Sequence, residues 1–253
     1  MDEIIEINKK FYDEYALNYD TSREGFYELE KDRIQNDLSV FFDVQAFPKV
    51  VLDVGCGTGF YALNAAMMGA QELHCIDISS SFLKMAKSQI EKKYPSVVVY
   101  THQADLRNFM IEKPEICNRA NLFVMGAVLQ YVPGYDAILQ NLIRCAPQAN
   151  YYISSTIYPE TKVSCVEKAL ISVDYALYRT LKNIPKVPKK TYPKVTLKVD
   201  PEVMEQIFDQ AGLNIIISRY TSFHTKFMSK LHQKMCNVIP NMGSYFTLIA
   251  CQN

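Results

Sequence analysis

The chain has 253 residues, a length that suits one large domain or two small ones with a substantial buried core. Its 27 basic and 27 acidic residues cancel, which argues against nucleic acid as the main partner, because nucleic-acid binders carry an excess of positive charge. The seven cysteines lack CxxC spacing, the first residues lack a signal-peptide core, and no apolar run approaches the length of a membrane span. We therefore expect a cytoplasmic protein with reduced thiols, no membrane contact and no metal site.

The first 45 residues predict a helical cap. Apolar residues recur at helical spacing over 2–19 and again over 26–43, and the intervening NYDTSREG supplies turn residues. From residue 49 onward, short apolar runs alternate with helical segments. The predicted strands cover 49–54, 72–77, 96–101, 120–125, 150–154, 213–220 and 244–251. The predicted helices cover 59–69, 80–93 with Ser79 as its cap, 134–146, and 200–211 with Gly212 as its stop.

This alternation predicts an α/β fold, a doubly wound parallel sheet with helices on both faces, in a single domain over 1–253. Residues 46–154 form its predicted cofactor-binding core, and residues 200–253 its closing helix and hairpin. Between them, residues 155–199 are an insertion in which several prolines rule out a regular helix over the second half. Because the insertion follows the fifth strand, we predict a lid above the carboxyl ends of the strands, where such sheets bind ligands.

A glycine loop follows the first predicted strand, in the segment VVLDVGCGTG. Its glycines, Gly55, Gly57 and Gly59, remove side chains where a ligand needs to approach the backbone closely. A dinucleotide-binding loop has the spacing GxGxxG, and here its third glycine would fall on Phe60. A Walker loop requires Lys-Ser or Lys-Thr after its glycines, and neither follows this loop. Both phosphate-binding interpretations therefore lose support.

Three aspartates accompany the loop and favour a ligand with cationic ends. Asp77 ends the second strand, where it can accept hydrogen bonds from two ribose hydroxyls. Asp105 follows the third strand, where it can accept one from an adenine amine, and Asp53 beside the glycines can face an ammonium group. Such carboxylates repel a phosphate and suit S-adenosylmethionine (SAM). Taken singly, Asp77 and Asp105 are also consistent with caps of a helix or turn, so the prediction depends on their joint positions.

The segment VVLDVGCGTG, followed by CID and ADL, resembles the class I SAM-dependent methyltransferases, and the chain is most similar to their small-molecule type. The resemblance covers most of the chain and implies a Rossmann-like sheet of seven mostly parallel strands whose last strand is antiparallel. It also implies SAM as cofactor, S-adenosylhomocysteine (SAH) as product, and cofactor-binding roles for the glycines and the three aspartates. Neighbouring positions in the family's motifs are expected to share cofactor binding: Cys56, Ile78, Leu106, Met125 and Gly126.

The start of the chain carries a row of tyrosines. Tyr12, Tyr15 and Tyr19 share one face of the predicted helix, and small-molecule members of the family have a similar helix that closes over the cofactor. We predict that Tyr12 and Tyr19 contact the cofactor and that Tyr15 contacts the substrate. Tyr19 borders the predicted turn and is also a catalytic candidate, because a tyrosine face can steady a sulfonium cation. Packing of this helix face against the core is an equal alternative.

The methyl acceptor needs a pocket and, where the acceptor is a hydroxyl, a base. We predict Gln130, Tyr131 and Tyr158 at the substrate and His224 as the base, although Gln130 stands where the family often has a histidine. The predicted function is methyl transfer from SAM to an oxygen or nitrogen of a small molecule by in-line displacement. Two alternatives stay open: an RNA or protein methyltransferase that uses the basic 182–198 stretch, and a SAM-binding protein without methyl transfer.

Overall fold

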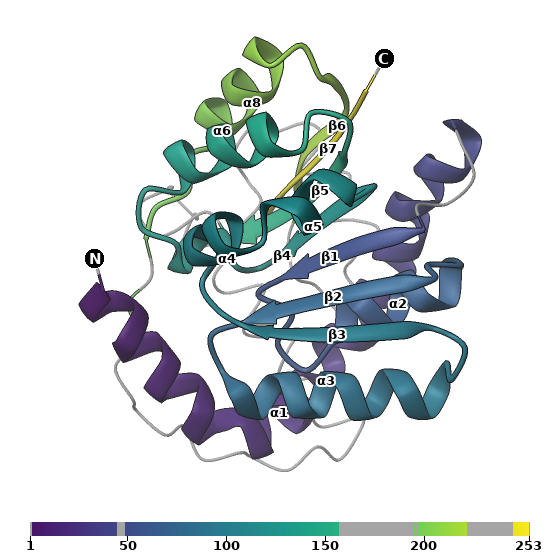
Figure 1. The fold of residues 1–253 in the computed structure, drawn as a ribbon, viewed down its shortest axis with the longest axis vertical. Coiled ribbons are helices and arrows are strands. Elements are labelled where there is room, and N and C mark those ends of the chain that lie inside the picture. The colour runs from purple at the N-terminus through teal and green to yellow at the C-terminus, as the bar shows by residue number, and fades with distance from the viewer. Residues whose placement is uncertain (1, 45–48, 157–194, 196, 222–244, 253) are drawn as a thin grey trace, which may run out of the picture.

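The computed structural model describes residues 2–44, 49–156, 195, 197–221 and 245–252. These residues form one seven-stranded sheet and the helices packed against it (Figure 1). Its strands are β1 (Val50–Val54), β2 (Glu72–Asp77), β3 (Val98–Gln103), β4 (Leu122–Gly126), β5 (Asn150–Thr156), β6 (Asn214–Thr221) and β7 (Tyr245–Cys251). They lie in the order β3-β2-β1-β4-β5-β7-β6. The first five strands pair in parallel, and β7 runs antiparallel to both β5 and β6. The predicted sheet with its antiparallel last strand is confirmed.

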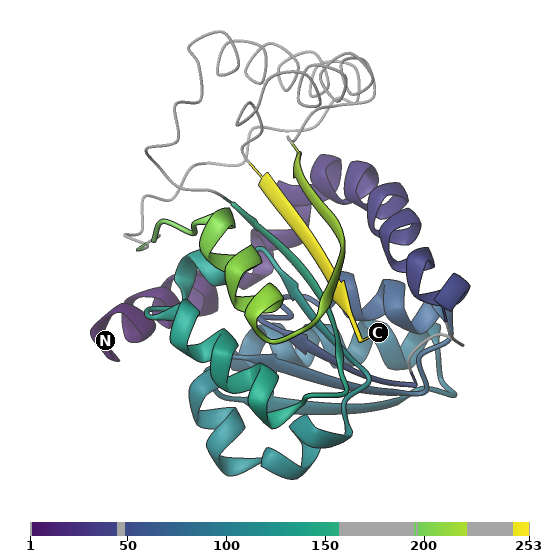
Figure 2. The same ribbon diagram turned by 90° about the horizontal axis from the view of Figure 1, so that it is seen from above.

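Helices cover both faces of the sheet. One face carries α1 (Asp2–Val44), α2 (Phe60–Met68) and α3 (Ser80–Lys93); the other carries α4 (Leu106–Glu112), α5 (Pro114–Arg119), α6 (Tyr135–Cys145) and α8 (Pro201–Gln210). Figure 2 shows α1 and α2 on one side of the strands and α6 and α8 on the other. A short 3-10 turn, η1 (Leu129–Tyr131), follows β4.

The core consists of two layers, one on each side of the sheet. Successive residues of a strand point to opposite faces, so Val51 of β1 packs with α2 and α3 whereas Leu52 packs with α4 and α6. In the same way Tyr152 and Tyr151 of β5 enter opposite layers, and both are fully buried. Central strands that are buried on both faces explain the near-continuous apolar runs in the sequence.

The predicted turn over 18–25 is wrong, because α1 is one helix from Asp2 to Val44. Tertiary contacts hold this segment in helical form. The carboxylate of Asp20 accepts hydrogen bonds from Thr58 Oγ1 at 2.5 Å and from Gln89 Nε2 at 3.1 Å, so the glycine loop and α3 both fix it. Packing of this kind overrides local turn propensity.

Two further differences concern the third strand and the segment after it. β3 begins at Val98, two residues later than predicted, because its bounds follow from pairing with β2, from Glu72 opposite Val98 to Asp77 opposite Gln103. At this sheet edge most β3 side chains are exposed, so apolar residues do not mark the ends of the strand. The short helices α4 and α5 were not predicted; Asp105 caps the first of them.

The predicted lid over 155–199 lies mostly outside the described residues, although its first two residues extend β5 to Thr156. Val195 and residues 197–199 lead into α8, and Val199 is fully buried. Among the helices that the structure describes, none is long and apolar enough to cross a bilayer.

Candidate active site

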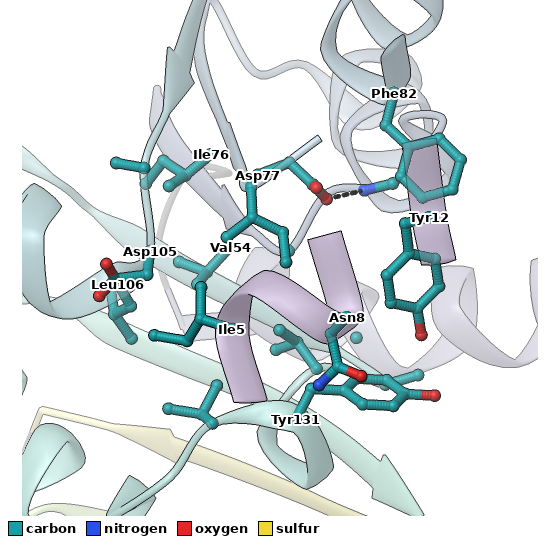
Figure 3. Close-up of a pocket in the computed structure, with 18 of the residues that line it drawn as sticks. Ile5, Asn8, Tyr12, Val54, Ile76, Asp77, Phe82, Asp105, Leu106 and Tyr131 are labelled. Atoms are coloured by element: carbon teal, nitrogen blue, oxygen red, sulfur yellow. Dashed lines mark hydrogen bonds between the residues drawn. The ribbon is translucent and has the colours of Figure 1, made fainter. Parts of the chain in front are cut away.

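A cleft with an empty volume of about 840 Å³ opens at the carboxyl ends of β1, β2 and β4, beneath the first part of α1 (Figure 3). It lies where the strand order switches from β1 to β4, the position at which open α/β sheets bind ligands. Its lining includes many of the predicted cofactor residues: Tyr12, Tyr19, Gly55, Gly57, Asp77, Ile78, Asp105, Leu106 and Gly126. The predicted substrate residue Tyr131 lines it as well.

The glycine loop forms the floor of the cleft, and two of its glycines serve different purposes. At Gly55, whose φ is +66°, an added Cβ would come within 2.3 Å of Val128 Cγ2, so only glycine lets the turn after β4 pack against the loop. At Gly57, whose φ is +53°, an added Cβ would meet nothing nearer than Tyr19 Cε1, at 3.9 Å. The backbone of Gly57 is therefore open to a ligand in the cleft.

Asp77 is fastened at the end of β2 by backbone donors. Its Oδ2 accepts a hydrogen bond from the N–H of Gly57 at 2.9 Å, and its Oδ1 accepts one from the N–H of Ser79 at 2.8 Å. Burial raises the pKa of Asp77 to about 6, the two N–H groups oppose the rise, and the Asp13 carboxylate adds to it. Each carboxylate oxygen can accept a second hydrogen bond, so Asp77 can still receive two hydroxyl donors.

Asp53 lies beneath the loop and does not line the cleft. Its Oδ2 accepts a hydrogen bond from the N–H of Ala62 at 2.9 Å, whereas its buried Oδ1 has no hydrogen-bond partner among the described residues. Burial raises the pKa of Asp53 to about 7; the Ala62 N–H opposes this rise and the Asp77 carboxylate adds to it. The predicted contact with an ammonium group stays a prediction, and the orphaned oxygen is consistent with it.

Asp105 lines the opposite end of the cleft from Tyr12 (Figure 3) and also caps α4. Its Oδ1 accepts hydrogen bonds from the N–H groups of Arg107 at 3.0 Å and Asn108 at 3.2 Å. Its Oδ2 accepts a hydrogen bond from Asn108 Nδ2 at 2.6 Å, and because a carboxylate oxygen can accept more than one hydrogen bond, Asp105 keeps acceptor capacity for the predicted adenine contact. Next to it, buried Leu106 contributes an apolar surface to the cleft.

Aromatic rings from α1, α3 and η1 form one wall. The ring of Tyr12 lies 5.6 Å from those of Phe82 and Tyr131, measured between centroids, and the ring of Tyr19 lies 4.8 Å from that of Phe82. Tyr15 packs against Tyr19 at 6.1 Å but does not line the cleft. The same rings therefore dock the helix and border the cleft, and their contact with the cofactor stays a prediction.

Several other predicted residues lie behind the cleft wall. Cys56 is buried under the loop, and its Sγ donates a hydrogen bond to Gly57 O at 3.4 Å. Gly59 is the N-cap of α2, and an added Cβ there would lie 2.9 Å from Ala86 Cβ, so this glycine allows α2 and α3 to pack closely. Met125 is fully buried in the core. Gln130 is buried as well and bonds to protein groups; His224 and Tyr158 lie outside the described residues.

Sequence reasoning missed other lining residues: Ile5, Asn8, Phe82, Ala104, Arg107, Ala127, Val128, Val132, Pro133 and Ile138. Ile5 and Asn8 precede Tyr12 by seven and four positions, so the tyrosine face extends toward the start of α1, and helical spacing was the signal that could have found them. The amide of Asn8 bonds to both backbone groups of Val195, at 2.9 and 3.1 Å. Nothing local in the sequence indicates that contact.

The chemistry of the lining fits a nucleoside that carries a positive charge. The acidic groups are Asp77 and Asp105, with Asp53 below the floor, whereas Arg107 is the only basic residue in the lining that the structure describes. Apolar residues suit a base ring: Leu106 follows β3, Val128 follows β4, and Ile138 lies on α6. Among the described residues, no group of three or more His, Cys, Asp or Glu side chains could hold a metal ion.

Residues 48–198 match the family model described as "Methyltransferase domain". This region is more than half of the chain, and the chain belongs to this family of enzymes. The prediction of a class I SAM-dependent methyltransferase is confirmed, and SAM is the methyl donor of that class.

The chain is 36% identical over 117 residues to a ribosomal protein L11 methyltransferase of Ruminiclostridium cellulolyticum, a match that covers 46% of this chain and 35% of the relative. It is 35% identical over 81 residues to protein arginine N-methyltransferase 1 of Saccharomyces cerevisiae, and this match covers 32% of this chain and 22% of the relative. The matches thus span about a third or less of these relatives. The solved magnesium protoporphyrin IX methyltransferase from Synechocystis PCC 6803 with bound SAH has the same fold, with 13% identity, a TM-score of 0.60, and coverage of 97% and 100%.

Proposed function

We propose that this enzyme transfers the methyl group of SAM to an oxygen or nitrogen atom of a small molecule. The observation that supports the proposal is the composition of the cleft. The accessible backbone of Gly57 and the hydrogen-bonded carboxylate of Asp77 lie in one cleft, beneath the tyrosines of α1. The cleft sets these polar groups among apolar and aromatic side chains, the composition expected of a site for a small ligand.

In this proposal different residues contact different parts of the cofactor. Gly55 and Gly57 support the methionine part, Asp77 accepts hydrogen bonds from the ribose hydroxyls, and Asp105 with Ile78 and Leu106 borders the adenine. Tyr12 and Tyr19 lie against the sulfonium, an interaction worth about 0.5–2 kcal/mol for each ring. The ordered hydrogen bonds of Asp77 support its part, because they hold the carboxylate in place before any ligand binds.

SAM held by these residues would supply an electrophilic methyl carbon for in-line displacement by the acceptor, with SAH as the leaving group and the acceptor's proton passing to a base or to solvent. The task of the protein is to orient the acceptor and exclude water. Tyr131 and Tyr12 border the cleft on the side that α1 covers, and we assign the acceptor to this side. His224 as base and Tyr158 at the substrate stay predictions for residues outside the described part of the chain.

Calorimetric titration with SAM, SAH and NAD tests the cofactor site. We expect micromolar binding of SAM and SAH and none of NAD, because the carboxylates around the loop repel a pyrophosphate. Binding of NAD alone would refute the proposal. A positive result justifies a screen of amine and hydroxyl metabolites for transfer of a radiolabelled methyl group.

A protein acceptor is the second candidate, and the relatives named as ribosomal protein L11 and protein arginine methyltransferases favour it. The two candidate functions can be distinguished by whether the methylated product is a protein or a small molecule. Radiolabelled SAM is incubated with the enzyme and with either a desalted protein extract or the small-molecule fraction of the same cells. Label that stays with protein after gel electrophoresis supports the second candidate, and label confined to small molecules supports the first.

We also infer a cytoplasmic location. All five described cysteines, Cys56, Cys75, Cys117, Cys145 and Cys251, are free thiols, as expected in a reducing compartment.

A further inference from the structure

The turn after β4 contains a strained residue at the edge of the cleft. Ala127 has a φ of +56°, and it is the only non-glycine residue with a positive φ in the part of the chain that the structure describes. An alanine is disfavoured there because its Cβ crowds the backbone oxygen. Strain of this kind persists only where surrounding contacts impose it, and it concentrates at functional sites.

One contact that holds Ala127 comes from Gln130. The side chain of Gln130 is buried, with 2% exposure, and both ends of its carboxamide are used. Its Nε2 donates a hydrogen bond to Ala127 O at 2.8 Å, and its Oε1 accepts one from Ser155 Oγ at 2.9 Å. A carbonyl can only accept and the hydroxyl here donates, so these partners fix the orientation of the amide. Ser155 belongs to β5, which anchors the carboxamide to the sheet.

The position of this turn matters to the glycine loop. Ala127 and Val128 both line the cleft, and Val128 Cγ2 lies 2.3 Å from where a Cβ of Gly55 would be, so turn and loop are in direct van der Waals contact. The base of the turn is also fixed, since the N–H of Ala127 donates to Ser154 O at 2.6 Å. If Ala127 relaxed to a right-handed or extended conformation, Val128 would shift against the loop.

We propose that Gln130 is a positioning residue for cofactor binding, which holds Ala127 in its left-handed conformation and thereby seats Val128 against the glycine loop. The proposal rests on the proposed function, in which this cleft binds SAM and SAH. It assigns Gln130 a role behind the wall of the cleft in place of the substrate contact expected from its position in the sequence.

The test is a double-mutant cycle with SAH affinity, measured by calorimetry, as the readout. Gln130→Met and Gln130→Leu both keep a side chain close in size to glutamine and remove both hydrogen bonds. We expect each to weaken SAH binding by about fivefold to tenfold, the cost of leaving an alanine in the left-handed region without support. Because glycine adopts that region freely, each loss falls to within about twofold in an Ala127→Gly background.

Rescue by Ala127→Gly is a result that a merely structural role for Gln130 does not produce. Equal losses in the alanine and glycine backgrounds, or unchanged affinity in both Gln130 variants, would overturn the proposal. If one of the two Gln130 variants does not fold, the other alone completes the cycle. Failure of the wild-type protein to bind SAH would instead refute the proposed function.

Discussion

Two backbone N–H groups, those of Gly57 and Ser79, donate hydrogen bonds to the Asp77 carboxylate and orient it. The oriented carboxylate can accept hydrogen bonds from a ligand without first rearranging. Asp77→Ala is expected to weaken SAM binding by about 1–3 kcal/mol, because the ribose hydroxyls lose a charged acceptor. Asp77→Asn, which keeps one acceptor oxygen, is expected to lose less. Calorimetric titration measures both, and thermal unfolding shows whether the loop still folds. Unchanged SAM affinity in Asp77→Ala would show that Asp77 does not bind the ribose.

Asp53 makes the stability of the protein depend on pH. Its pKa is about 7 in the folded protein and near 4 in the unfolded chain, so between these values the folded state holds a proton that the unfolded state has released. The protonated Asp53 carboxyl therefore contributes fully to the free energy of unfolding below about pH 4. This contribution is lost as the pH rises toward 7, by up to about 1.4 kcal/mol per pH unit.

Asp53→Asn removes this titration. Urea unfolding at several pH values should show the wild-type protein losing stability relative to Asp53→Asn as the pH rises from about 4 to 7, with a constant difference above that range. A difference that is the same at every pH would show that Asp53 is ionised throughout, and the buried oxygen would then need another partner.

At the scale of elements, α1 brings Tyr19 over the glycine loop, 3.9 Å from where a Cβ of Gly57 would be. If its ring faces the sulfonium, Tyr19→Leu should weaken SAM binding by about 0.5–2 kcal/mol and SAH binding by less, because SAH carries no charge on sulfur. The ratio of the two affinities isolates this effect from any loosening of the helix.

Tyr15→Leu is the matched control for that comparison, since Tyr15 packs on Tyr19 without lining the cleft. The control variant should leave the ratio of SAM to SAH affinity unchanged. Equal losses for both ligands in Tyr19→Leu would assign Tyr19 to helix docking alone.

For the whole molecule, a ligand that binds only the folded state stabilises it by mass action. At a SAH concentration of one hundred times Kd, the gain is about 2.7 kcal/mol, which for a chain of this size raises Tm by about 5–10 °C. Differential scanning fluorimetry measures the shift, with NAD at the same concentration as the control. An equal shift with NAD would contradict the assignment of the cleft to SAM.

Local features were the predictable part of the fold. Helix α3 begins and ends where predicted, because Ser79 caps it through a hydrogen bond from the Phe82 N–H and its apolar spacing needs no distant partner. The glycine loop and the aspartates at the strand ends were predictable for a similar reason. Parallel strands place their carboxyl ends at one edge of the sheet, so motifs that follow successive strands meet there.

The sequence by itself therefore determined the α/β class, the order along the chain of the strands and the longer helices of the sheet region, and the carboxylates and glycines that gather at one edge of the sheet. Tertiary structure alone decided three other matters. It continued α1 through 18–25 by bonding Asp20 to Thr58 and Gln89, it brought Asn8 to Val195, and it turned Gln130 away from the cleft toward Ser155 and Ala127. The physical reason is that each depends on hydrogen bonds between residues that no local pattern relates, and which partner a polar side chain meets is set by how the layers pack.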